Sequence, residues 1–377
     1  MRLHRLWAMA RKEFLHIIRD PRSLGMGIAI PLLMLILYGY ALTLDVDKVP
    51  AVIWDQSQSP TSRELISRFH GSRYFSIRGY ASSYGELEQA IDTRQALIAL
   101  IIPPDLAGRI KSGRPASVQL IADGSDSNTA TMAIGYAETI IRIYSEEVTL
   151  EQIRRAGGQS LRQPIELRPR VWFNADLESR NYIIPGLIAV IMMVIAALLT
   201  SLTVAREWEN GTMEQLISTP IKSQELILGK LIPYFTIGLF DVFLAVAMGK
   251  VLFEVPLRGS AALLFIMTAV FLVGTLSMGL LISVVAKNQL VANQMAMVMT
   301  FLPSFLLSGF VYAISNMPRF LQIITYFVPA RYFVDILRGI YLKGVGLEVL
   351  WPEALLLTVF GAVMVILSNV KFKKKLE

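Results

Sequence analysis

The chain has 377 residues, of which 54% are hydrophobic and 17% are charged, with a formal net charge of +7. A soluble protein of this size carries more charge, and the apolar residues here come in blocks of about 20, the length that crosses a bilayer core. The chain contains no cysteine, so disulfides and thiolate metal sites are excluded. The composition therefore indicates a membrane protein.

The placement of the basic residues indicates which segments face the cytoplasm. Residues 1–22 carry six Arg and Lys side chains, and the C-terminus ends in the run Lys373-Lys374-Lys375. Residues 45–180 are nearly balanced, with 16 basic and 17 acidic side chains. Short basic flanks stay inside, whereas long domains cross regardless of charge. We therefore expect both termini in the cytoplasm and residues 45–180 outside, with no nucleic-acid partner.

Residues 3–17 have the spacing of an amphipathic helix in the membrane interface, here called the elbow helix. Trp7 and Phe14 fall on its apolar face, while Glu13 and Arg19 fall on other faces. A plain anchor before the first membrane span is the alternative. The pair Asp20-Pro21 ends this helix.

The first apolar block, residues 24–42, is predicted to span the membrane and to be kinked at Pro31. It is longer than the apolar core of a signal peptide and lacks a small-residue cleavage site. We expect it to be retained, so that residues 1–44 form the elbow helix and the first span.

Residues 45–180 alternate short apolar runs with amphipathic stretches, which predicts a compact inserted α+β domain. A linker of residues 157–169 leads back to the membrane. The expected strands are residues 51–55, 74–79, 96–102 and 117–122, and the expected helices are residues 61–69, 83–91 and 125–155.

Residues 181–377 hold five further apolar blocks, so the membrane domain is predicted to be all-α with six transmembrane helices. The stretch 313–340 is too apolar for an ordinary loop and is broken at Pro318 and Pro329. We expect short re-entrant helices there, covered by protein or water. The five blocks are residues 182–204, 226–252, 260–286, 289–312 and 352–370.

The inner segment 205–224 has the densest charge beside the membrane. Gly211 is expected to break the preceding helix, and residues 212–217 to form a short helix stopped before Pro220. A short amphipathic helix facing the cytoplasm is a docking surface for a partner. A solvated loop helix is the alternative.

This segment reads REWENGTMEQLISTP from residue 206, followed by LGKLIPY from residue 228. Both runs resemble the permease subunit of type-2 ATP-binding-cassette (ABC) exporters. The runs VIWDQ, IPPD and DGSDSNTA in the 45–180 region, and LSGF and PARY near the end, resemble the multidrug-efflux branch, which has a large extracytoplasmic domain between the first and second spans. Thr93-Arg94-Gln95 departs from that pattern, in which a turn of glycine and an acidic residue is expected.

The resemblance implies residue roles. The elbow helix, with Trp7, Phe14 and Arg19, is expected to complete the contact with ABC ATPase subunits. The coupling segment is expected to make that contact through Arg206, Glu207, Gly211, Thr212, Glu214 and Pro220.

The motor itself is expected in another chain, because no stretch matches the phosphate-binding pattern G-x-x-x-x-G-K-[ST]. We therefore expect a transporter subunit that is not an enzyme and holds no cofactor, with ATP and Mg²⁺ bound by the partner ATPase. Six spans form half of an exporter pathway, so a dimer with a second copy or a paralogue is implied. The expected location is the bacterial cytoplasmic membrane, among lipid, and a periplasmic membrane-fusion adaptor is a further expected partner.

Three polar residues within the spans are candidates for the translocation path or the dimer seam. Asp241 lies near the middle of its span, where a charge costs at least ~2.5 kcal/mol. A neutral or hydrogen-bonded acid between helices is the alternative. Asn293 and Gln294 are interpreted as helix–helix contacts or substrate contacts. Gly274 and Gly279 are expected to permit close packing.

The leading hypothesis is the export of amphiphilic or hydrophobic compounds, such as drugs and lipid-like molecules. The alternatives are export of a polysaccharide or lipid-linked glycan, an ion-coupled secondary transporter, and a mechanical transmitter that passes no substrate. A secondary transporter needs more intramembrane charges than Asp241, and a transmitter usually has fewer spans.

Overall fold

The computed structural model describes residues 3–42, 47–155, 172–174 and 178–372. The chain divides into two compact units, one of Met1–Thr43 with Arg170–Glu377 and one of Leu44–Pro169. The second unit ends at Pro169, whereas the domain was expected to reach residue 180. Asn181 donates to the Asn174 side chain at 2.9 Å, which ties the segment before the next helix to the membrane unit. The predicted linker 157–169 lies outside the described residues.

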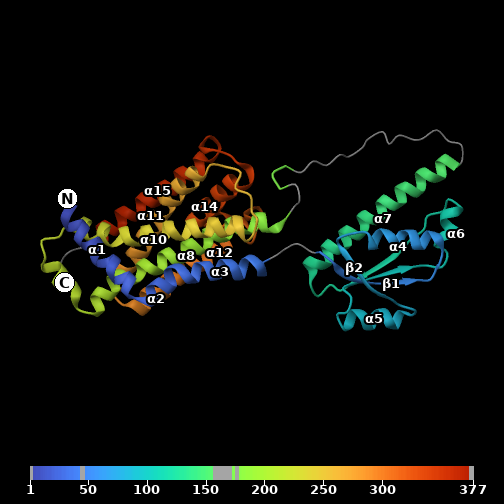
Figure 1. Cartoon of the computed structure of the whole chain (residues 1–377), viewed down its shortest axis with the longest axis horizontal. Coiled ribbons are helices and arrows are strands. Elements are labelled where there is room, and N and C mark those ends of the chain that lie inside the picture. The colour runs from blue at the N-terminus through green and yellow to red at the C-terminus, as the bar shows by residue number, and fades with distance from the viewer. Residues whose placement is uncertain (1–2, 43–46, 156–171, 175–177, 373–377) are drawn as a thin grey trace. The chain divides into compact units, whose positions relative to one another are not determined.

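The Leu44–Pro169 unit is a four-stranded sheet in the order β2-β1-β3-β4, in which the first three strands are parallel and β4 is antiparallel to β3. Figure 1 shows helices on both faces. All residues of β3 are buried, as expected for a strand covered on both faces. The strands are β1 (Val49–Asp55), β2 (Phe75–Tyr80), β3 (Ile98–Ile102) and β4 (Gln119–Ala122).

Two apolar cores flank this sheet. One contains Leu65 and Phe69 of α4 and Ala137 of α7, and the other contains Leu87 and Ala90 of α5. The helix α6 was not predicted. Arg94 takes the left-handed conformation (φ +57°) where the related pattern expects glycine. The helices are α4 (Pro60–His70), α5 (Tyr84–Asp92), α6 (Leu106–Lys111) and α7 (Ser127–Arg155).

Five helices among the described residues are long and apolar enough to cross a membrane, and one broken helix pair adds a sixth candidate. The helix α8 is almost wholly buried by its neighbours and forms the centre of the unit (Figure 1). The predicted α12 block ends five residues early, at Leu307, because Gly309 turns the chain with φ +80°. The five helices are α8 (Ser179–Glu209), α10 (Ser223–Val251), α11 (Ala261–Ala286), α12 (Gln289–Leu307) and α15 (Leu347–Lys371).

The close approach of α8 and α11 depends on Gly279. A Cβ at this position would lie 2.4 Å from the Ala197 carbonyl oxygen, so a larger residue does not fit. One turn later, the Ser283 hydroxyl accepts the backbone N–H groups of Val204 and Ala205, each at 2.9 Å. The close packing expected at Gly279 is confirmed.

The first apolar block differs from the single helix predicted over residues 24–42. It comprises α2 (Pro21–Leu24), the π-turn η1 (Gly25–Ala29) and α3 (Ile30–Ala41), and its apolar helix Gly27–Ala41 is shorter than the five above. Pro31 has no N–H to donate, and the turn before it is widened, so that the Ile30 N–H reaches the Gly25 carbonyl. The irregularity expected at Pro31 thus takes the form of a π-turn directly before it.

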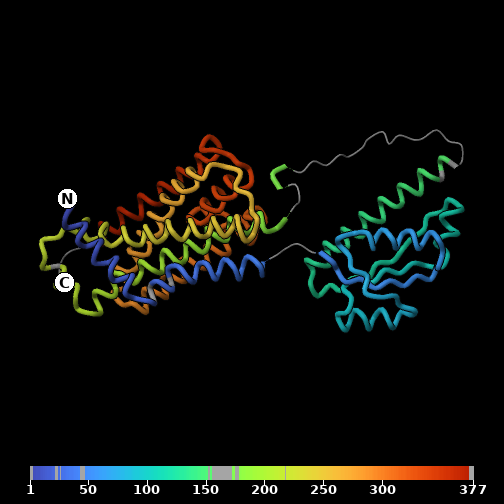
Figure 2. Tube along the Cα trace, in the orientation of Figure 1, coloured from blue at the N-terminus to red at the C-terminus, as the bar shows by residue number. Residues whose placement is uncertain are grey.

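The start of α1 (Leu3–Arg19) and the end of α15 lie at the same end of the membrane unit, as Figure 2 shows. The helix α1 packs along α10, and its Arg5 donates to the Pro220 carbonyl beyond α9 (Thr212–Ser218). Phe372, after α15, packs in one cluster with Met213 of α9. A helix therefore covers the residues of the predicted elbow helix, and the predicted short helix at residues 212–217 lies at the same end of the bundle.

The opposite end of the bundle holds the short helices expected near residues 313–340. α13 and the following α14–η3 pair are bent by 83° from each other, and Pro318 and Pro329 stand at the starts of α13 and α14. Arg338 donates to the Gly309 carbonyl at 2.9 Å and lies 3.5 Å from the Tyr182 ring centroid. Tyr182 donates to the same carbonyl at 3.2 Å. The short helices are η2 (Ile314–Asn316), α13 (Arg319–Thr325), α14 (Pro329–Arg338) and η3 (Gly339–Lys343).

Candidate functional site

The helix α1 presents one face to the bundle and the other to its surroundings. Trp7 is 66% exposed and Phe14 43% exposed, and Arg19 is exposed as well. Glu13, which the periodicity placed on a different face from Trp7 and Phe14, is only 4% exposed. Its burial could not be predicted, because its partner Lys230 lies far away in the sequence.

Gly229 of α10 permits this contact. A Cβ on Gly229 would lie 2.7 Å from the Met9 Cβ, so the two helices approach more closely than side chains normally allow. Glu13 lies one turn after Met9 on the same face of α1. The close approach therefore brings its carboxylate to Lys230, the residue after Gly229.

Lys230 is deeply buried, with 1% of the residue exposed. Its ammonium donates to Glu13 Oε1 at 2.6 Å, to Glu207 Oε1 at 3.2 Å and to the Thr203 carbonyl at 3.3 Å. An ammonium has three donors, and all three are used here. A buried cation is tolerated when it is paired and fully hydrogen-bonded in this way.

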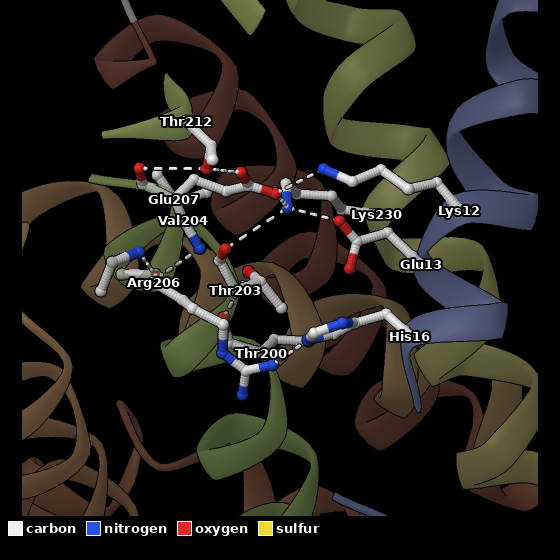
Figure 3. A network of polar contacts seen from close by, with 12 residues as sticks. Lys12, Glu13, His16, Thr200, Thr203, Val204, Arg206, Glu207, Thr212 and Lys230 are labelled. Atoms are coloured by element: carbon white, nitrogen blue, oxygen red, sulfur yellow. Dashed lines mark hydrogen bonds and ion pairs between the residues drawn. The ribbon is translucent and has the colours of Figure 1, made fainter. Parts of the chain in front are cut away.

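Glu207 joins the same network from the last turn of α8. Its Oε1 also accepts Lys12 Nζ at 2.9 Å, and its Oε2 accepts the Thr212 hydroxyl (Figure 3). Two acids and two bases meet, so their formal charges cancel. We refer to this group as the polar cluster, which consists of Lys12, Glu13, Glu207, Thr212 and Lys230.

The polar cluster joins α1, α8, α9 and α10 and borders a cavity of about 200 Å³. The cavity is lined by the polar cluster together with His16, Thr203, Arg206, Asn210 and Tyr234. Figure 3 shows the side chains of the polar cluster converging from separate helices.

The last turn of α8 contacts its neighbours through four consecutive residues. Arg206 contacts His16, which lies on α1. Its guanidinium lies 4.0 Å from the carboxylate of Asp20, the residue that follows α1. Glu207 reaches α1 and α10 as described. The Trp208 ring centroid lies 5.1 Å from the Lys287 ammonium, in the turn between α11 and α12.

The fourth residue, Glu209, reaches α12. It accepts the backbone N–H of Gln289 at 3.0 Å and its side-chain amide at 2.5 Å. Successive residues of a helix point about 100° apart, so four in a row surround the axis. The end of α8 is therefore held on all sides.

Gly211 turns the chain from α8 into α9. Its φ is +68°, a conformation that favours glycine, and no atom lies within 4 Å of the position of an added Cβ. The helix predicted over residues 212–217 is confirmed as α9. Its inner face is held by a second group, the apolar cluster, which consists of Val204, Met213, Leu226, Ile227, Leu280 and Phe372.

The outer face of α9 is open. Glu214, Gln215 and Ser218 are exposed, and Glu214 forms no ion pair with any residue that the structure describes. Pro220 is also exposed, and its carbonyl accepts Arg5. A firmly held short helix thus presents a polar surface outward.

The other predicted site residues lie elsewhere. Asp241 is 1% exposed inside the bundle, and within the described part of the chain neither of its carboxylate oxygens has a hydrogen-bond partner. Asn293 and Gln294 are exposed on α12. The structure does not bring these three residues to the polar cluster.

Sequence reasoning missed Lys230, Glu13, Lys12 and the Glu209–Gln289 contact. The need for a partner could be predicted, since a lysine near the start of an apolar helix requires one. The identity of the partner could not, because Glu13 is 217 positions away and local residue spacing does not indicate so distant a contact.

Comparisons with known proteins give a consistent result. Residues 21–369 match the family model described as ABC-2 family transporter protein. The chain is 39% identical to the probable multidrug ABC transporter permease YbhS of Escherichia coli over 387 residues, which cover 99% of this chain and 98% of that protein. It is 33% identical to the probable multidrug ABC transporter permease YbhR of the same organism, over 99% of each chain. The inner membrane transport permease YhhJ is 26% identical over 86% of this chain and 85% of its own length.

Proposed function

Since this chain belongs to the ABC-2 family of transporter proteins and is a permease subunit, not an enzyme, we propose that it exports amphiphilic or hydrophobic compounds across the cytoplasmic membrane. A separate ATPase subunit drives the transport. The names of two relatives, which describe probable multidrug permeases, support this class of substrate.

The open face of α9 is the surface that receives the ATPase in this proposal. Glu214 meets the partner directly, while Gly211, Thr212 and Pro220 hold α9 in place. The elbow helix α1 adds Trp7, Phe14 and Arg19 beside the contact.

The observation that carries the proposal is the set of contacts made by the last turn of α8. Movement of α9 pulls on Glu207 through Thr212, and the same turn is bonded to α1, α10 and α12. Because Glu207, Glu13 and Lys230 are buried, these helices move together when the partner closes. Substrate then passes along the seam between two permeases.

Six spans complete the membrane topology in this proposal, with the α2–α3 segment as the first. Both termini face the cytoplasm, and the Leu44–Pro169 unit lies in the periplasm, where it shapes the exit or docks an adaptor. The α13–α14 pair is re-entrant from the outer side.

The second permease, a further copy or a paralogue, packs on α12. That helix exposes Leu290 and Met297 on one face with Asn293 and Gln294 beside them, as a helix–helix seam requires. Asp241 is buried within its own bundle and takes no part in this seam.

The test is reconstitution of the chain with its ATPase in proteoliposomes, with amphiphile efflux and ATP hydrolysis measured in parallel. Deletion of Gly211–Pro220, or the charge reversal Glu214→Arg, should abolish or strongly reduce efflux. Glu348→Arg, an exposed glutamate at the opposite end of the bundle, is the matched control and should leave efflux unchanged. Full efflux from the deletion variant would overturn the coupling role, and absence of efflux from the unaltered complex would overturn the export function.

A further inference from the structure

The sheet of the Leu44–Pro169 unit reverses its winding between β1 and β2. These strands are parallel neighbours, and the chain leaves β1 into α4 on one face but leaves β2 into α5 on the other (Figure 1). The loops at their carboxyl ends therefore separate. In open α/β sheets such a point forms the crevice in which ligands bind.

A cavity of about 530 Å³ lies at this point. Ile66 and Ala81, both buried, supply its apolar part, and polar side chains of α4 and of the two loops supply the rest. Its volume falls within the range of about 300–1,000 Å³ that is usual for small-molecule sites. The cavity belongs to one compact unit and is separate from the polar cluster.

The Asp55 carboxylate, at the end of β1, is hydrogen-bonded to the loop that follows it and to α4. Its Oδ1 accepts the N–H groups of Ser57 and Gln58, each at 3.0 Å, and its Oδ2 accepts the Ser62 hydroxyl at 2.7 Å. Gln58, which lines the cavity, is held with φ +47°. A non-glycine residue held in this region is strained, and such strain gathers at ligand sites.

The remaining polar groups of the cavity are mostly donors. The Arg63 guanidinium has five N–H donors, and no residue that the structure describes forms an ion pair with it. His70 Nε2 and the Tyr80 hydroxyl lie 3.3 Å apart on the same wall. The carboxylate that lines the cavity already accepts three hydrogen bonds, so the exposed Arg63 guanidinium on α4 is left without a charged partner at this site.

We propose that this cavity binds a small organic anion, whose carboxylate or phosphate group pairs with Arg63 and accepts from the His70–Tyr80 pair. A carboxylate or phosphate fits the planar fork of a guanidinium in two-point contact, whereas a neutral sugar leaves the positive charge unpaired. The site exists whether or not the chain exports amphiphiles.

The test is calorimetric titration of the full chain in lipid nanodiscs with citrate, inorganic phosphate and, as the uncharged control, glucose. At least one anion should bind, and glucose should not. Arg63→Gln should weaken that binding by about tenfold, the usual loss for one charge-assisted contact. Tyr80→Phe should weaken it to a smaller degree.

Arg68→Gln is the matched control, because Arg68 lies on the same helix and pairs with Glu147 at 2.6 Å, outside the cavity. Its binding should equal that of the unaltered chain, and circular dichroism should show that all variants are folded. No binding of either anion up to millimolar concentration overturns the proposal. Equal weakening by Arg63→Gln and Arg68→Gln also overturns it, because general charge attraction then explains the binding.

Discussion

Glu13 and Lys230 are separated by 217 positions in the chain, and their charged groups meet at 2.6 Å with almost no access to solvent. This pair attaches α1 to α10. Since a buried charge that loses its partner is costly, the pair makes each helix dependent on the other.

Lys230→Met should destabilise the membrane unit by about 3–5 kcal/mol, because Glu13 loses its buried partner. Glu13→Gln combined with Lys230→Met should cost clearly less than the sum of the single changes, since the double variant leaves no orphaned charge at this contact. Thermal unfolding of the purified variants measures both. Lys222→Met, an exposed lysine at the start of α10, is the control, and additive single effects would show that the two residues do not interact.

Gly211→Ala should cost about 1–2 kcal/mol through backbone strain, since φ there is +68°. Gly113→Ala is closely matched, with φ +69° and equally open space, but it lies in the other unit. The two variants should lose similar stability. Only Gly211→Ala should lower efflux per ATP hydrolysed by the reconstituted complex, and an equal drop in both would contradict a specific role for the α8–α9 turn.

Gly279→Ala and Gly135→Ala should have opposite effects. The first places a methyl group against the backbone of α8, at 2.4 Å from the Ala197 oxygen, and forces two helices apart. The second lies inside α7 with open space around it and should gain about 0.5–1 kcal/mol from better helix propensity. Unfolding followed by circular dichroism reports both signs, and a neutral Gly279→Ala would mean that α8 and α11 can separate at no cost.

Tyr144 should make the Leu44–Pro169 unit sensitive to alkaline pH. Its hydroxyl donates to the Thr61 carbonyl at 3.1 Å, and burial raises its pKa from 10.0 to about 12. The folded state favours the neutral phenol, so this stabilisation is complete below pH 10 and is lost as pH rises toward 12.

Tyr144→Phe removes this titration. Unfolding measured at several pH values should show the variant to be less stable at neutral pH, with the difference shrinking above pH 10. A constant difference across that range would mean that Tyr144 does not titrate with unfolding.

Most of the helices and strands could be predicted from local sequence patterns. The apolar run at Ile98–Ile102 predicts β3, the N-cap residues near Ser127 predict the long α7, and Gly211 with Pro220 predicts α9. Six-residue α6 was missed because Pro103-Pro104 reads only as a stop.

Contacts between residues that are far apart in the sequence could not be predicted in this way. From the sequence alone, Glu13 has the character of a surface residue and Lys230 that of an isolated charge. Their pairing becomes visible only when α1 and α10 are packed together. The first apolar helix is shorter than predicted. Residue composition does not reveal this, because it does not show that the Ile30 N–H bonds to the Gly25 carbonyl in a π-turn before Pro31. The chemistry of the candidate site thus depends on which helices meet.

The contacts at the two ends of α8 have a mechanical consequence. Near its start, Tyr182 binds the Gly309 carbonyl and supports Arg338, and near its finish Glu207 binds Lys12 and Lys230. One continuous helix of on the order of 40 Å separates these two attachments. Pro185 lies inside the helix close to the first attachment, and from there α8 continues unbroken to Glu207, so a tilt imposed at Glu207 is carried along most of the bundle as by a lever.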